Sequence, residues 1–349
     1  MIAHTIGRAL GAAAIALSFV AAVPQAAASP TPFSALYAFG DSLSDVGNFF
    51  TLSGGTIPDP AGYQNGQWSN GNVWLQTLAG QLNLAPLTPS LLGGTDFAYG
   101  GAQSGATLAH AANPLDVSGV TGQIAQFKAA HPVADPNALY ALWIGGNDLL
   151  GINAGMTPAQ LQLLAAQTVG NIETAIANLA SAGARNLLVL TLPDVGKTPG
   201  VLADGPVASG TASAIAASFN QLLLNGNAGS GIPGLSALGS TLGLNLTIFD
   251  AFGFMDGIIA NPGVLGLTNV TQACLSAPAT ACANPDQYFF WDDTHPTAVA
   301  HAALGNAVYG ALAIPEPATW AMVILAFGMV WLVSRRRIHA TGGDTMQQV

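Results

Sequence analysis

The hydrophobic residues of this chain fall into short apolar runs that alternate with longer segments of helical periodicity. Short apolar runs that end at glycine or polar residues are typical of strands buried on both faces of a parallel sheet. On this basis we predict five strands, at residues 35–39, 97–99, 138–144, 186–192 and 244–249.

The clearest helical segment is 158–182, where apolar residues recur on one face, Pro158 suits the first turn and Gly183 ends the helix. Strands that alternate with helices favour parallel β-α-β units with right-handed crossovers. We therefore predict an α/β fold, a three-layer α/β/α sandwich with a mostly parallel five-stranded sheet. Further helices are predicted at 72–82, 124–131, 212–224 and 297–312.

Three of the predicted strands end in glycine and polar residues: Gly-Asp-Ser at 40–42, Gly-Gly at 100–101 and Gly-Gly-Asn-Asp at 145–148. Because the carboxyl ends of parallel strands lie at one edge of a sheet, all three segments can contribute to one site. Ser42 is expected where a strand turns directly into a helix, and the free N–H groups of a helix start favour an oxyanion.

Taken alone, residues 40–48 have other interpretations. Asp41, Ser42, Ser44 and Asp45 are all residues that cap helices and form turns, and that role explains them equally well. The segment is not the Gly-x-Ser-x-Gly elbow, because Ser44 occupies the place of the second glycine. An aspartyl-phosphate site is favoured less, because no second aspartate follows Asp41 two residues later.

The first 28 residues have the features of a secretory signal. Arg8 precedes an apolar run at 10–23, and three alanines at 26–28 precede Ser29. The run is shorter than the roughly 20 residues that a membrane-spanning helix needs, so we expect cleavage after Ala28 rather than a permanent anchor.

The other end carries Pro-Glu-Pro at 315–317, an apolar run at 318–333 and three arginines at 335–337. The run is marginal for a membrane span, and the arginines would hold its far end in the cytoplasm. Residues 314–338 resemble the PEP-CTERM sorting signal of Gram-negative bacteria. The resemblance implies transient anchoring in the inner membrane, removal by an exosortase-type peptidase, and a destination at the cell surface or extracellular matrix. A permanent C-terminal anchor is the alternative.

Residues 33–312 remain as one expected domain, and their composition limits the partners. The formal net charge of the whole chain is −10, and outside the terminal segments the only cationic residues are Lys128, Arg185 and Lys197. So few cations cannot neutralise a phosphate backbone, which excludes nucleic acid as a main partner. Outside the cytoplasm, a disulfide between Cys274 and Cys282 is favoured over two free thiols. We predict no cofactor and no metal site.

A polar block near the end of this domain contains the sequence Trp-Asp-Asp-Thr-His-Pro-Thr at 291–297. Asp292 and His295 are three residues apart in a predicted turn, close enough for the carboxylate to reach the ring, whereas Asp293 is expected to point elsewhere. A metal site at Asp292, Asp293 and His295 would need a second ligand cluster, which the sequence does not offer. The remaining histidines, which we expect to be structural, are His4, His110, His131, His301 and His339.

Four blocks together resemble the GDSL or SGNH hydrolases, in the family's order and at its approximate spacing: 39–48, 99–102, 145–148 and 291–297. The resemblance implies that Ser42 is the nucleophile, His295 its base and Asp292 the partner that orients His295. It also implies that Gly101 and Asn147 are oxyanion-hole donors beside the Ser42 N–H. Gly101 is preferred to Gly100 because Ser104 follows it at the family's spacing. Asp96 is a departure, since many relatives have asparagine there.

These residue types can perform acyl transfer. A serine hydroxyl becomes a good nucleophile when a neighbouring histidine takes its proton, and fixed N–H donors stabilise the tetrahedral oxyanion. The sequence therefore predicts an exported serine hydrolase of carboxylic esters, of esterase or lipase type. The alternatives are an acyltransferase or deacetylase acting on acylated exopolysaccharide, and a non-catalytic matrix protein. The aromatic residues Phe49, Phe50, Tyr63 and Trp68 either line an acyl pocket or pack in the interior, and packing is favoured.

Overall fold

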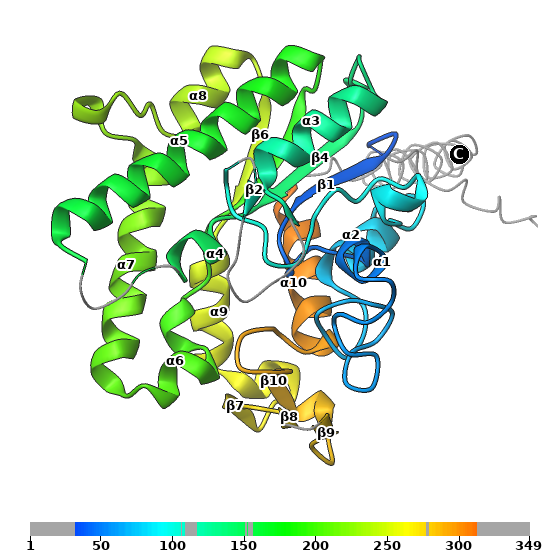
Figure 1. Ribbon diagram of the computed structural model, residues 1–349, viewed down its shortest axis with the longest axis vertical. Helices are drawn as coiled ribbons and strands as arrows, with labels where there is room; N and C mark the ends of the chain where they lie inside the picture. Colours follow the sequence, from blue (N-terminus) through cyan, green and yellow to red (C-terminus); the bar gives the residue numbers. More distant parts are fainter. Residues whose placement is uncertain are drawn as a thin grey trace, which may run out of the picture. The chain divides into compact units, whose positions relative to one another are not determined.

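The computed structural model describes residues 32–105, 107–108, 117–150, 152, 156–276 and 279–312. The predicted signal peptide and the predicted sorting segment lie outside these residues. A parallel sheet lies at the centre of the described part (Figure 1), and its strand order is β1-β4-β5-β6. Its strands are β1 (Leu36–Gly40), β4 (Leu139–Trp143), β5 (Asn186–Leu190) and β6 (Asn245–Phe249).

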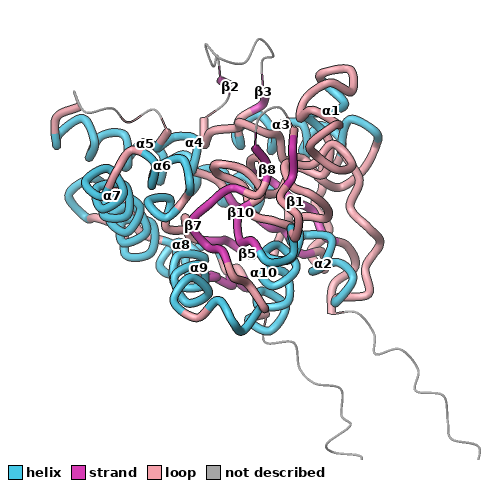
Figure 2. The backbone as a smooth tube through the Cα atoms, turned by 90° about the horizontal axis from the view of Figure 1, so that it is seen from below, coloured by secondary structure: helices cyan, strands magenta, loops and turns pink. Residues whose placement is uncertain are grey.

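Alternate residues of these strands point into two hydrophobic cores. On one face Phe39, Tyr140 and Val189 pack against helices α3, α5, α7 and α8. On the other face Ala38, Ala141 and Leu188 pack against helices α2 and α10. The side chains of a strand alternate between its two faces, so a strand with no polar interior position needs helices on both sides. The predicted three-layer α/β/α sandwich is confirmed, and Figure 2 shows helices on both sides of the strands.

The predicted number of strands in this sheet is wrong. The described part contains a four-stranded sheet, and residues 95–99 run beside β1 without being a strand of it. The Ala38 N–H donates to the Thr95 carbonyl at 3.1 Å, and the Phe97 and Tyr99 N–H groups donate to the Ala38 and Gly40 carbonyls at 2.8 and 3.2 Å. The side-chain amide of Gln123 interrupts this pairing at Gly40, whose carbonyl it shares with the Tyr99 N–H. It accepts from the Gly40 N–H at 2.9 Å and donates to the Gly40 carbonyl at 2.7 Å.

The helix predictions are confirmed in position but not in every boundary. Helix α5 (Pro158–Ala182) has the predicted bounds, with Thr157 as its N-cap and Gly183 in the left-handed conformation after it. Helix α7 begins before the predicted residue 212, because Pro206 starts a turn of small residues that shows no helical periodicity. The other longer helices are α2 (Trp74–Gln81), α3 (Val120–Ala130), α7 (Pro206–Asn225), α8 (Leu235–Leu242), α9 (Ala251–Ala260) and α10 (Ala298–Ala311).

Short elements complete the described part. The short helices are α1 (Asn48–Leu52), α4 (Gly146–Leu149) and α6 (Pro199–Ala203). The 3-10 turns are η1 (Ser90–Leu92), η2 (Val195–Lys197), η3 (Ala228–Ser230), η4 (Pro262–Leu265) and η5 (Pro285–Gln287). The strand pairs are β2 (Thr107–Leu108) with β3 (Val117–Ser118), β7 (Asn269–Ala273) with β10 (Tyr288–Phe290), and β8 (Leu275–Ser276) with β9 (Thr280–Ala281).

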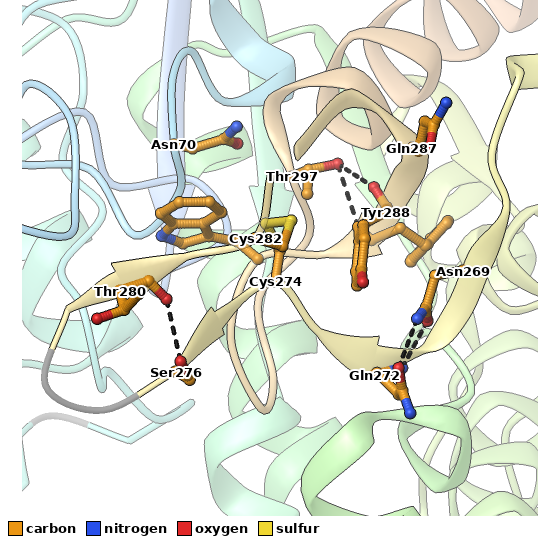
Figure 3. Close-up of a disulfide and its surroundings, with 12 residues drawn as sticks. Asn70, Asn269, Gln272, Cys274, Ser276, Thr280, Cys282, Gln287, Tyr288 and Thr297 are labelled. Atoms are coloured by element: carbon orange, nitrogen blue, oxygen red, sulfur yellow. Dashed lines mark hydrogen bonds between the residues drawn. A yellow bond between two sulfur atoms is a disulfide. The ribbon is translucent and has the colours of Figure 1, made fainter. Parts of the chain in front are cut away.

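The predicted disulfide between Cys274 and Cys282 is confirmed, with the two sulfur atoms 2.02 Å apart. It closes the β8–β9 hairpin, where the Ser276 hydroxyl also donates to the Thr280 carbonyl at 3.1 Å (Figure 3). Among the residues that the structure describes, no helix combines the length and the apolar character needed to cross a membrane.

Candidate active site

Ser42 lies in a turn at the carboxyl end of β1. The Ser44 and Asp45 N–H groups both donate to the Asp41 carbonyl at 3.0 Å, so the chain turns immediately after Gly40. A Cβ atom at Gly40 would lie 2.4 Å from the Trp143 carbonyl oxygen, so the close pairing of β1 with β4 requires glycine there. The expectation that Ser42 opens a helix is wrong, because α1 starts only at Asn48 and has five residues.

The side chain of Asp45 explains why α1 does not begin before Asn48. Its buried carboxylate accepts from the N–H groups of Gly47, Asn48 and Phe49 at 2.8, 2.6 and 3.1 Å, which fixes the turns before α1. It also accepts from the Gly100 N–H at 2.8 Å and so joins the Ser42 turn to the glycine pair. Burial raises the pKa of Asp45 to about 6, although these four donors lower it. Sequence reasoning interpreted Asp45 only as a turn residue, because its partner at Gly100 is distant in the sequence.

Three hydrogen-bond donors near Ser42 are available to an oxyanion. Within the described part of the chain, neither the Ser42 N–H nor the Gly101 N–H donates to any acceptor. The Asn147 side-chain amide donates one hydrogen to the Ala102 carbonyl at 2.8 Å, which leaves its second hydrogen. Since the Gly100 N–H is already bonded to Asp45, the geometry favours Gly101 over Gly100 as a donor.

Asp148 holds the segment that follows the glycine pair, residues 99–104, against residues 145–148. Its carboxylate accepts from the Ser104 N–H at 2.9 Å and from the Ser104 hydroxyl at 2.7 Å. The Gln103 amide adds a hydrogen bond to the Asn147 carbonyl at 3.1 Å. These bonds fix the segment that contains Gly101 against the short helix α4 that carries Asn147.

His295 connects Ser42 to Asp292. Its Nε2 lies 2.9 Å from the Ser42 Oγ, and its Nδ1 lies 2.7 Å from the Asp292 Oδ2. The other oxygen of Asp292 accepts from the N–H groups of Thr294 and His295 at 2.8 and 2.6 Å. Asp293 is exposed, and its main-chain carbonyl accepts from the Gly200 N–H at 2.9 Å. The structure therefore brings Ser42, His295 and Asp292 together and leaves Asp293 outside.

The two ionisable groups of this pair stabilise each other's charged forms. Burial raises the pKa of Asp292, but the charge of His295 and the hydrogen bonds from His295 and Tyr63 outweigh it, and the pKa falls to about 2. Burial lowers the pKa of His295, whereas the charges of Asp292 and Asp41 and the bond to Asp292 raise it, and the net shift is upward.

Sequence reasoning missed the role of Tyr63. Its hydroxyl donates to the Asp292 Oδ2 at 2.6 Å, the same oxygen that faces the His295 ring. Burial and the charge of Asp292 both raise the pKa of Tyr63, so the hydroxyl keeps its proton. The two residues are 229 positions apart, and no local pattern in the sequence marks the contact. Beside Tyr63, the Trp68 ring lies 5.4 Å from the His295 ring, centroid to centroid.

Two other histidines have the structural roles that the sequence predicted. His301 is buried, accepts from the Trp74 N–H at 3.3 Å, and has its pKa lowered to about 3 mainly by burial. His131 stacks on Phe127 with their ring centroids 5.0 Å apart. Among the described residues, no group of three or more His, Cys, Asp or Glu side chains could hold a metal ion. His4, His110 and His339 lie outside the described residues.

A cavity of about 1070 Å³ adjoins this cluster, and both Ser42 and Asn147 line it. Most of the other lining residues are apolar, and helices α4, α6, α7, α9 and α10 all contribute to the lining. The site therefore places a serine hydroxyl, a paired histidine and free N–H donors beside a large apolar space.

The order of these four blocks agrees with a known family. The model of the family described as GDSL-like lipase/acylhydrolase matches residues 36–308. The chain belongs to this family. The matched residues include the whole of the site described above, from Ser42 to His295.

Similar proteins include enzymes of more than one kind. The chain is 28% identical over 296 residues to the thermolabile hemolysin of Vibrio parahaemolyticus, covering 79% of this chain and 63% of that protein. It is 29% identical over 329 residues to the phosphatidylcholine-sterol acyltransferase of Aeromonas hydrophila, covering 83% of this chain and 93% of that protein. An acetyl xylan esterase structure from Geobacillus stearothermophilus is 12% identical, with a TM-score of 0.40, over 82% of this chain and 100% of that one. This structural likeness is too distant to bear on the substrate.

Proposed function

We propose that the protein is a serine hydrolase that cleaves carboxylic esters through an acyl-enzyme on Ser42. The observation that carries this proposal is the continuous contact from the Ser42 Oγ through the His295 ring to the Asp292 carboxylate. His295 takes the hydroxyl proton as the Ser42 Oγ attacks the ester carbonyl carbon, and Asp292 stabilises the imidazolium that forms.

The tetrahedral intermediate would then accept hydrogen bonds from the Ser42 N–H, the Gly101 N–H and the Asn147 amide. Each such donor is worth on the order of 10²–10³ in kcat. As the intermediate collapses, the C–O bond to the alcohol breaks and His295 returns its proton to that oxygen. A water molecule, deprotonated by His295, next attacks the acyl carbon and releases the carboxylic acid and free Ser42.

The test is ester turnover by the purified protein and by Ser42→Ala. With p-nitrophenyl butyrate we expect turnover by the wild type and a loss of at least about 10³ in kcat for the variant. Circular dichroism checks that the variant is folded. A folded Ser42→Ala protein that keeps its turnover would overturn the assignment, and an inactive wild type would favour the non-catalytic matrix protein.

Acyl transfer to an alcohol is the second candidate. It is favoured by the similarity to the Aeromonas acyltransferase over 93% of that protein's length. The same acyl-enzyme would serve, with the acceptor alcohol replacing water. Products formed with an added alcohol acceptor separate the two activities, because a transferase yields the new ester and a hydrolase the free acid. Acetylated polysaccharide, offered both as acyl donor and as acceptor, tests the remaining alternative.

We also propose that the protein is exported and then processed near Pro317 by an exosortase-type peptidase. Export is supported by the secretory-signal features of residues 1–28 and by the resemblance of residues 314–338 to a PEP-CTERM sorting signal. The disulfide between Cys274 and Cys282 also supports it. Intact mass of the protein from its native host tests this, with a start at Ser29 and loss of the segment after Pro317 expected. An uncut C-terminus would favour a permanent membrane anchor instead.

A further inference from the structure

The cavity beside Ser42 is far larger than a small acyl group requires. Its volume is about 1070 Å³, and its walls include Leu149 of α4, Val201 of α6, Ile215 of α7 and Met255 of α9. An acetyl group on Ser42 would leave most of this space to water. A long acyl chain would displace that water and cover the apolar walls, which is the favourable direction.

Two of the apolar side chains that line this cavity are poorly covered by the rest of the protein. Val207 at the start of α7 is 82% exposed and Leu150 after α4 is 62% exposed. A bound apolar chain would remove them from water together with the inner walls. The apolar part of the lining therefore ranges from buried residues to largely exposed ones.

The charged groups that line the cavity are of one sign. The described lining residues include neither lysine nor arginine, and the exposed carboxylates Asp204 and Asp293 belong to it. A substrate with a phosphate or carboxylate on its alcohol would meet these negative charges without a cationic partner. An uncharged alcohol has no such penalty.

We propose that this cavity binds the acyl chain of medium- to long-chain esters of uncharged alcohols. The inference rests on the proposed ester hydrolysis at Ser42 and adds the class of substrate. Each buried methylene should raise kcat/KM by up to about fourfold, until the chain fills the cavity. A shallow polar site for acetylated sugars would show no such rise.

The first experiment measures kcat/KM for p-nitrophenyl acetate, butyrate and octanoate with the full-length protein. A steady rise from acetate to octanoate is expected. Hydrolysis of all three at similar rates would overturn the acyl-chain proposal while leaving the proposed function intact. Failure to hydrolyse any of them would overturn the proposed function, so the two failures are distinguishable. Octanoyl glycerol should also exceed octanoyl glycerol phosphate, and equal rates would overturn the preference for uncharged alcohols.

The second experiment fills the cavity from one wall. Ala212 lines the cavity from α7, and Ala214 lies exposed on the same helix outside it, so Ala214→Trp is the matched control for Ala212→Trp. The ratio of octanoate to acetate kcat/KM should fall at least about tenfold in Ala212→Trp and stay unchanged in Ala214→Trp. An unchanged ratio in a folded Ala212→Trp protein would overturn the proposal. If that variant does not fold, Ile215→Ala removes wall contacts instead and should lower the ratio severalfold.

Discussion

The side of the site that carries Ser42 and the side that carries His295 are held in place in different ways. Ser42 follows the buried strand β1, and its turn is fixed by Asp45, whose exposed fraction is 0%. Asp292 and His295 lie between β10 and α10, with exposed side-chain fractions of 17% and 13%. The first side is anchored in the protein core, and the second is assembled close to the surface.

Hydrogen bonds from distant segments support the His295 side. Besides the bond from Tyr63 to Asp292, residues 62–70 contribute three more. They join the Trp291 indole to the Gly62 carbonyl at 3.1 Å, the Ser69 hydroxyl to the Pro296 carbonyl at 2.8 Å, and the Ala298 N–H to the Asn70 side chain at 2.7 Å. The disulfide-closed hairpin adds a bond from the Leu275 N–H to the Trp291 carbonyl at 2.6 Å. Because they are supported differently, the two sides should respond differently to substitution. Changes on the His295 side should affect kcat more than stability, and changes in the core network should affect stability more than kcat.

The largest difference between neighbouring residues is expected at Asp292 and Asp293. Asp292→Asn removes the carboxylate that orients His295 and stabilises its imidazolium. In the trypsin-like triad that serves as the standard example, this change costs about 10⁴ in kcat, which is an upper expectation here. Asp293→Asn, the matched control, changes an exposed side chain and should cost less than about threefold in kcat.

The pH profile of kcat/KM gives a second readout for Asp292. The raised pKa of His295 places the acid limb of the wild-type profile above the usual histidine pKa of about 6.5. Without Asp292 the lowering by burial dominates, so the acid limb of Asp292→Asn should move to lower pH. A larger loss of kcat in Asp293→Asn than in Asp292→Asn would contradict the assignment of Asp292.

The sequence predicted the catalytic candidates but not the contacts that support them. Each catalytic candidate stands in a short local block, and the structure brings Ser42, His295 and Asp292 within hydrogen-bond distance. The supports are non-local and were not predicted, as the contact from Tyr63 to Asp292 shows. The expected fifth strand is incomplete, because the N–H groups of Phe97 and Tyr99 bond to β1 whereas the Gly40 N–H bonds to the Gln123 side chain. The expected helix at Ser42 failed because Asp45 fixes turns there first.

Tyr63→Phe, also on the His295 side, should lower kcat less than Asp292→Asn does. The change removes one hydrogen bond to the Asp292 carboxylate while Asp292 stays ionised at neutral pH, because its pKa starts at about 2. We expect a loss of kcat of about ten- to a hundredfold, since a hydrogen bond to a charged group contributes about 1.5–3 kcal/mol. The acid limb of the kcat/KM profile should also shift, because the lost hydrogen bond is made to the carboxylate oxygen that faces His295.

Tyr140→Phe is the matched control for Tyr63→Phe. Its hydroxyl donates to the Asp135 carbonyl at 2.9 Å, so this variant also loses one tyrosine hydrogen bond, but not one to Asp292. Its kcat and pH profile should match those of the wild type. If both variants lose kcat equally with no shift in the acid limb, Tyr63 contributes only to packing and not to the position of Asp292.

Asp96→Asn tests the core network and should have the smallest effect on kcat, less than about threefold. Asp96 is fully buried beside Asp45 and accepts from the Val46 N–H at 2.8 Å and the Ala98 N–H at 3.0 Å. An asparagine keeps only one acceptor oxygen, so the variant should lose about 1–3 kcal/mol of stability at low pH.

The loss of stability in Asp96→Asn should shrink as the pH rises. Burial raises the pKa of Asp96 most, and the charge of Asp45 raises it further. An acid whose pKa is raised by folding contributes its full stability below its unfolded pKa of about 3.9 and loses it as the pH rises through the folded pKa. The neutral asparagine has no such loss, so the two unfolding free energies should converge as the pH increases. Urea unfolding between about pH 4 and pH 8 measures this convergence.

Asp135→Asn is the comparison variant, because its loss of stability should change with pH in the opposite direction. Hydrogen bonds from the Ser34 hydroxyl and the Asn137 N–H lower the pKa of this partly exposed carboxylate. A lowered pKa stabilises the fold above the unfolded pKa and stops doing so as the pH falls through the folded pKa, so the Asp135→Asn difference should grow with rising pH. If the Asp96→Asn difference also grows with pH, then Asp96 is ionised in the folded protein. In that case the core network would hold two adjacent ionised carboxylates, and the hydrogen bonds to Asp96 would outweigh the effect of burial on its pKa.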